Sequence, residues 1–115
     1  MTVARTLITV PSTAKRGEII EIRVLIQHPM ETGYRRSSEG EMQPRNLIRR
    51  FTCSFQEDGT TGSGVPIFSA SLYAAVSANP FLTFHARATA SGGFVFNWEG
   101  DNGFVQSDRA AIRVA

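Results

Sequence analysis

Hydrophobic residues recur at every second position over most of the chain. The clearest case is residues 18–27, where Ile20, Ile22, Val24 and Ile26 alternate with positions that are mostly polar or charged. A period of two places alternate side chains on opposite faces of an extended chain, so this segment predicts a half-buried β-strand. No segment shows the sustained 3.6-residue period of an amphipathic helix. The pattern therefore indicates an all-β fold.

The same alternation recurs in four further long segments and two short ones. The predicted strands cover residues 6–10, 18–27, 46–55, 67–72, 81–89, 94–99 and 104–114. About seven short strands in a single domain, residues 1–115, are typical of an immunoglobulin-like β-sandwich. The spacing of the last three strands predicts an antiparallel meander.

Turn residues separate the predicted strands. Gly and Asn accept the positive φ of hairpin turns, which predicts turns at Ser91-Gly92-Gly93 and at Gly100-Asp101-Asn102-Gly103. A short helical turn is expected over residues 73–78, and Asn79-Pro80 would end it because a residue before proline avoids the α region. Two longer connections, residues 28–45 and 57–66, are where we expect binding, because loops on a rigid sandwich carry it.

The lone cysteine, Cys53, shares a strand face with Phe51 and Phe55. A reactive thiol needs exposure and a nearby cation or helix N-terminus to lower its pKa. We therefore expect Cys53 to be a buried structural residue. Because the sequence has a single cysteine, an internal disulfide and a Cys-rich zinc site are excluded. The alternative is an independent thiol enzyme or persulfide carrier that uses Cys53.

The remaining polar residues form no recognisable catalytic, cofactor-binding or metal-binding set. His28 and His85 lie far apart and lack partners at ligand spacing, so we expect them to face solvent or an interface. A generic adhesion or carbohydrate-binding sandwich is a further alternative. Trp98 argues against it, because this only tryptophan alternates onto the apolar face of its strand.

The charge balance gives little indication of a nucleic-acid partner. Twelve basic and ten acidic residues leave a net charge of +2, too small for a nucleic-acid footprint. Five arginines and two glutamates cluster along the chain and leave a local excess of positive charge. These side chains are either exposed to solvent or attract an anionic surface of a partner. The cluster consists of Arg35, Arg36, Arg45, Arg49 and Arg50 with Glu39 and Glu41.

No apolar run approaches the roughly 18 residues of a membrane span. The first residues lack the layout of a secretory signal, so the sequence by itself predicts a cytoplasmic protein.

Several unusual motifs nonetheless resemble one family from end to end and in the same order. They are ITVPSTAKRGEIIEI from Ile8, QHPMETGYR from Gln27, PRNLIRRFTCSF from Pro44, VPIFSASLYAAVSANPFLTF from Val65 and FNWEGDNG from Phe96. Together they resemble SoxZ, the Z subunits of the sulfur-oxidation (Sox) carrier complex.

The resemblance implies an immunoglobulin-like, non-catalytic subunit without cofactor or metal. It implies a heterodimer with SoxY, which carries thiosulfate-derived sulfur on the cysteine of a Gly-Gly-Cys-Gly-Gly arm, and transient contacts with other Sox enzymes. This chain ends AIRVA, so we expect it to be the non-carrying partner. The resemblance also implies a periplasmic location, reached by co-export on the twin-arginine signal of SoxY.

Two motifs, residues 28–33 and 79–81, are predicted to form the partner interface. The alternative is that both are turns needed only for folding. Met30 is expected to be a flexible contact residue beside hydrogen-bonding groups. Ile19 and Leu25, on the polar face of their strand, are candidates for an apolar patch, through which the isolated subunit could also self-associate. The candidate interface residues are His28, Pro29, Met30, Glu31, Thr32, Gly33, Asn79, Pro80 and Phe81.

Overall fold

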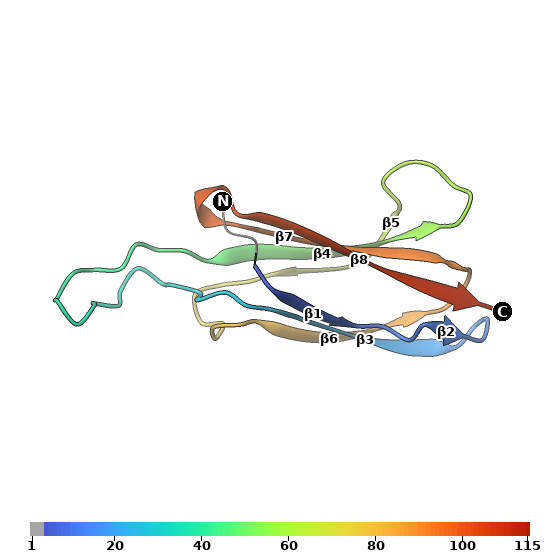
Figure 1. Cartoon of the computed structure of the whole chain (residues 1–115), viewed down its shortest axis with the longest axis horizontal. Helices are drawn as coiled ribbons and strands as arrows, with labels where there is room; N and C mark the ends of the chain where they lie inside the picture. Colours follow the sequence, from blue (N-terminus) through green and yellow to red (C-terminus); the bar gives the residue numbers. More distant parts are fainter. Residues whose placement is uncertain (1–3) are drawn as a thin grey trace.

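The protein folds into two facing β-sheets (Figure 1), which the computed structural model describes for residues 4–115. One sheet has the strand order β1-β3-β6 and the other β2-β8-β7-β4-β5, which confirms the all-β, immunoglobulin-like sandwich. Within the described part of the chain, no helix is long and apolar enough to cross a membrane. The elements are β1 (Thr6–Thr9), β2 (Thr13–Ala14), β3 (Ile19–Ile26), β4 (Ile48–Glu57), β5 (Val65–Ser71), β6 (Phe81–Arg87), β7 (Gly92–Gly100), the 3₁₀ turn η1 (Asp101–Gly103) and β8 (Val105–Val114).

The seven predicted strands all form, and the structure adds one. Strand β2 pairs in parallel with the end of β8, through Thr13 with Arg113 and Ala14 with Val114. Two residues are too short to produce an alternating pattern, so the sequence did not predict this strand.

The predicted meander of the last three strands is wrong. Strand β6 pairs with β3 in one sheet, whereas β7 pairs with β4 and β8 in the other. Residues 88–91 therefore carry the chain across the sandwich, and of these three strands only β7 and β8 form a hairpin. Hydrophobic alternation identifies the buried face of a strand but does not identify its neighbour.

Gly92 serves a different purpose from the turn that the sequence predicts. It is a buried residue within β7, where an added Cβ would lie 2.2 Å from the carbonyl oxygen of Gln56. Glycine is required because β4 approaches so closely. Asn102 and Gly103 do have the expected positive φ, at 60° and 74°. Residues 73–78 form only a single turn, closed by the Val76 N–H donating to the Tyr73 carbonyl.

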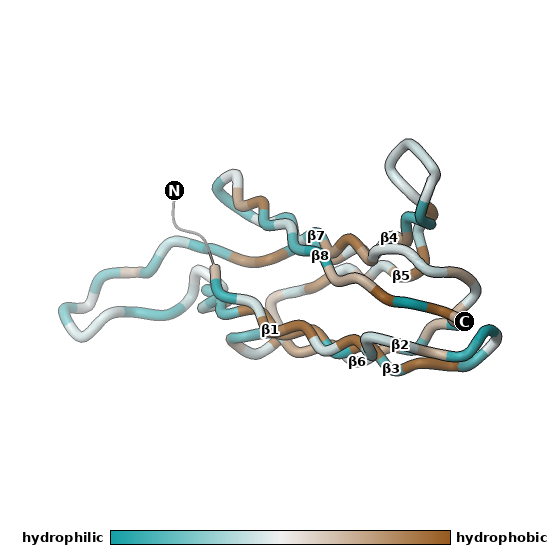
Figure 2. Tube along the Cα trace, turned by 45° about the vertical axis from the view of Figure 1, so that its right-hand side comes forward, coloured by the Kyte–Doolittle hydropathy of each residue, from teal (hydrophilic) through white to brown (hydrophobic). Residues whose placement is uncertain are grey.

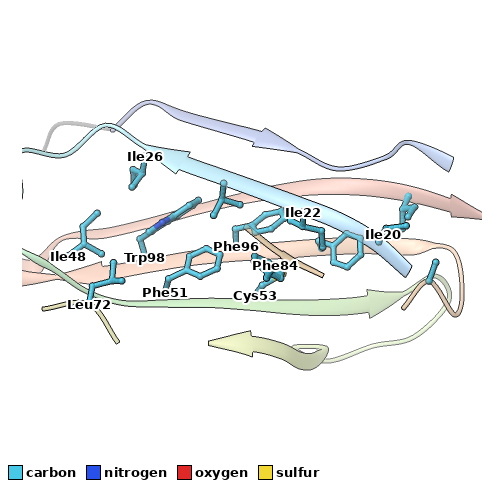
Figure 3. Packing of buried hydrophobic residues seen from close by; sticks show 14 of the residues in the cluster. Ile20, Ile22, Ile26, Ile48, Phe51, Cys53, Leu72, Phe84, Phe96 and Trp98 are labelled. Carbon is cyan, nitrogen blue, oxygen red and sulfur yellow. The ribbon is translucent and has the colours of Figure 1, made fainter. Parts of the chain in front are cut away.

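The core lies between the sheets and combines aromatic rings with many aliphatic side chains (Figure 3). Phe51 contacts Phe96 and Trp98 from the five-stranded sheet and Phe84 from the opposite one. Phe68 stacks on Phe84 at a centroid distance of 4.3 Å. These contacts confirm that Phe51 and Trp98 lie on the buried faces of their strands, as the alternation predicts.

One segment leaves this body. Between β3 and β4, residues 31–46 form a long hairpin, here called the arm, which projects beyond one end of the sandwich (Figure 1). Two isolated bridges, Glu31 with Asn46 and Arg36 with Met42, hold its two sides together. The arm is mainly hydrophilic, whereas the apolar segments concentrate along the strands (Figure 2).

Candidate functional site

The two motifs of the candidate interface meet at one corner of the sandwich. The backbone N–H of His28 donates to the Asn79 Oδ1 at 2.9 Å, and the Asn79 N–H donates to the His28 carbonyl at 2.7 Å. Asn79 adopts a positive φ of 55°, which asparagine tolerates better than most residues. The structure thus joins segments that lie 51 positions apart.

Met30 anchors this corner to the core. Its side chain is 5% exposed. Its Sδ accepts from the Ile48 N–H at 3.3 Å, and its own N–H donates to the His28 Nδ1 at 3.0 Å. The expectation that Met30 is a flexible surface contact is therefore wrong: the chain turns inward after Pro29, with Met30 at a φ of 51°.

His28 is also buried, against the expectation that it faces solvent or an interface. Its ring lies edge-on to Phe104 at 5.2 Å, and its buried Nε2 has no hydrogen-bond partner among the described residues. Burial lowers the pKa of His28 below its ordinary value of 6.5, while the nearby Asn46 and Asp101 oppose the shift. The neutral ring with an unprotonated Nδ1 is the form that fits, because this nitrogen accepts the Met30 N–H.

We expect the stability of the protein to fall as the pH drops below about 6.5. The folded-state pKa is lowered, so the unfolded chain binds the His28 proton first and is favoured as pH falls. Melting temperatures measured between about pH 7.5 and 5 should show this loss in the wild type. His28→Asn should flatten the profile, because it removes the buried ring that titrates. A profile for His28→Asn as steep as that of the wild type would contradict the assignment.

The other candidate interface residues differ in accessibility. Pro80 is buried, and Glu31, Thr32 and Gly33 are half-buried. Pro29, Asn79 and Phe81 are exposed, with Phe81 56% accessible. Their contact with a partner stays a prediction.

Strand pairing places two further apolar residues beside Phe81. On the outer face of the three-stranded sheet, Leu7 pairs with Leu25, which in turn pairs with Phe81. Leu7 is 64% exposed and Leu25 is half-buried between its neighbours. We call these three residues the outer row. Ile19 lies at the opposite end of β3, opposite Arg87, and is not part of it.

The base of the arm is held by Asp101, for which the sequence predicts only a place in a turn. Its carboxylate accepts from the Leu47 N–H at 3.0 Å and from the Arg49 Nε at 2.9 Å, and it pairs with Arg45 at 3.1 Å. The Arg49 hydrogen bond holds the pKa of Asp101 below its ordinary value, with the Leu47 N–H and Arg45 contributing. Much of the predicted arginine surplus is thus used within the fold.

Cys53 is fully buried on β4, as expected. Burial raises its pKa to about 12. The thiol therefore stays protonated at neutral pH. Across residues 4–115, no group of three or more His, Cys, Asp or Glu side chains is placed to hold a metal ion.

We expect iodoacetamide to label Cys53 only after unfolding, because the thiolate is the reactive form. Mass spectrometry of native protein at pH 7 should show no adduct over hours, whereas protein in guanidinium chloride should be labelled fully. Rapid labelling of the native protein would instead support the thiol-enzyme alternative.

Comparisons with known proteins agree with the fold. The structure of a superoxide reductase (neelaredoxin) from Ignicoccus hospitalis superimposes with a TM-score of 0.77 at 20% identity, covering 97% of this chain and 82% of that one. A superoxide reductase from Nanoarchaeum equitans gives 0.66 at 13% identity, covering 93% and 90%. The sulfur carrier protein SoxY from Chlorobium limicola f thiosulfatophilum gives 0.63 at 11% identity, covering 96% and 78%. At these identities the likeness concerns the fold alone.

Sequence comparison gives the family. A search of curated proteins found no match. The family model of the sulphur oxidation protein SoxZ, however, matches residues 8–111. This match covers most of the chain and confirms the resemblance carried by its motifs. The chain therefore belongs to the SoxZ family of sulphur oxidation proteins.

Proposed function

We propose that this chain is a non-catalytic subunit of the Sox sulfur carrier complex and pairs with SoxY. The observation that carries the proposal is the outer row. Leu7, Leu25 and Phe81 form a contiguous apolar strip on a sheet face whose remaining positions are mostly polar. Contiguous exposed apolar side chains on a soluble protein mark interaction sites.

The partner assignment rests on the family and is supported by the fold. Membership of the SoxZ family indicates the Sox system, and the SoxY structure has the same sandwich architecture. In this proposal SoxY carries the thiosulfate-derived sulfur, because the thiol of Cys53 is buried and protonated at neutral pH. The complex works in the periplasm, where this chain arrives by co-export with SoxY, and it meets the other Sox enzymes there transiently.

Co-expression with the SoxY of the same organism tests the pairing. Light scattering coupled to size-exclusion chromatography should give the mass of a one-to-one complex. Cell fractionation should then find this chain in the periplasm when SoxY has its signal and in the cytoplasm when the signal is deleted. Two chains that elute separately at micromolar concentration would contradict the pairing, and export that is independent of SoxY would contradict the proposed route.

A further inference from the structure

The arm is the largest feature of the molecule that the fold itself does not use. It lengthens the protein to 57 Å along an axis where the other two dimensions are 24 and 20 Å. An isolated two-stranded hairpin is at best marginally stable in water. The arm therefore contributes little to the stability of the sandwich, which suggests that it has a role in binding.

One face of the arm carries the residue types that favour protein contacts. The Ser37 N–H donates to the Glu41 carbonyl at 2.7 Å and the Gln43 N–H to the Arg35 carbonyl at 2.8 Å. This pattern makes Arg36 and Met42 a non-hydrogen-bonded pair, the geometry that brings opposite side chains closest.

Two further exposed residues lie next to this pair along the chain. Tyr34 lies two positions before Arg36 and Pro44 two positions after Met42, and all four side chains are exposed. We call them the arm face. Tyr34 is 82% exposed and Met42 46% exposed. Tyrosine, methionine and arginine are enriched in interfaces.

The charges of the arm indicate the charge that a complementary partner surface carries. Arg35 pairs with Glu31 at 2.7 Å and Arg45 with Asp101 at 3.1 Å. Arg36 donates to the Gly40 carbonyl at 2.8 Å and, within residues 4–115, forms no ion pair. A guanidinium beside exposed Tyr34 and Met42 is complementary to an apolar surface that carries a carboxylate.

The outer row alone is too small to form a stable interface. A standard interface buries about 800 Å² on each partner. Even an aromatic side chain buries only about 150–250 Å², so three partly exposed residues supply well under what a stable complex needs. The interface must therefore extend beyond the row.

The arm begins at the same end of the sandwich as the outer row. Leu25 directly precedes the last residue of β3, and Phe81 is the first residue of β6; both strand ends lie where the arm leaves the body (Figure 1). From this position and these charges we infer that the arm binds the same partner as the outer row. The arm face, made of Tyr34, Arg36, Met42 and Pro44, contacts a surface of SoxY that is both acidic and apolar. This inference rests on the proposed pairing with SoxY.

The test is the dissociation constant of the SoxY complex, measured by isothermal titration calorimetry with full-length variants. The double variant Tyr34→Ala/Met42→Ala and the charge reversal Arg36→Glu should each weaken the complex about tenfold or more. The melting temperature of the isolated variants should stay within a few degrees of the wild type, since these side chains lie outside the core. Ser38→Ala, at the exposed tip, and Gln43→Ala, on the opposite face, are matched controls that should leave affinity unchanged.

Hydrogen exchange provides a readout that needs no substitution. Backbone amides of residues 31–46 should become protected when wild-type SoxY is added. Unchanged affinity of both arm-face variants, or unchanged exchange in the arm, would overturn the inference and leave the pairing intact. An arm-dependent dimer of the isolated chain, with unchanged SoxY affinity, would overturn it in favour of a second copy. Absence of any complex with the wild-type chain would overturn the proposed function itself.

Discussion

Replacing Met30 with alanine should lower the free energy of unfolding by about 2–5 kcal/mol, the range for truncating a buried methionine. The side chain is 5% exposed and belongs to the core cluster. Its loss leaves a cavity and removes the sulfur that accepts the Ile48 N–H. At about 4 °C per kcal/mol, the melting temperature should drop by roughly 8–20 °C.

Met42→Ala is the matched control for that experiment. Met42 has the same side chain, but it is 46% exposed on the arm, so its truncation should change the melting temperature by no more than a few degrees. Equal melting temperatures for Met30→Ala and the wild type would show that the corner at His28 and Asn79 is not anchored in the core as described.

Phe81→Asp should weaken the SoxY complex by about 2 kcal/mol or more, roughly a thirtyfold rise in the dissociation constant. The substitution removes the aromatic end of the outer row and places a charge where an apolar contact is expected. The isolated variant should fold normally, because Phe81 is 56% exposed at the start of β6.

Val105→Asp provides the control for Phe81→Asp. Val105 is 60% exposed and begins a strand of the opposite sheet. The same charge there should leave SoxY affinity near that of the wild type. If Phe81→Asp binds as tightly as Val105→Asp, the outer row is not the interface.

The alternation of side chains predicted most of the fold, because burial of one strand face produces a hydrophobic residue at every second position of the sequence. Ile22, Phe96 and Trp98 point into the core as their period of two requires. No such pattern in the sequence shows which strands pair with each other. The place of β6 beside β3, and the short strand β2, depend on long-range contacts that no local pattern encodes.

The site was predictable in its motifs but not in its geometry. His28 and Met30 follow the end of a strand, where no period indicates which side chains turn inward, and their burial was missed. The sequence singled out Leu25 and Phe81 separately. Only the register of β1, β3 and β6 brings them together with Leu7.

We propose that this chain binds the sulfur carrier and carries no sulfur itself. Intact mass spectrometry distinguishes the two roles when both subunits are separated from the SoxY complex without reductant after thiosulfate turnover. We expect sulfur adducts on SoxY alone and an unmodified mass for this chain. A sulfur adduct on this chain that disappears in a Cys53→Ala variant would show that Cys53 carries sulfur.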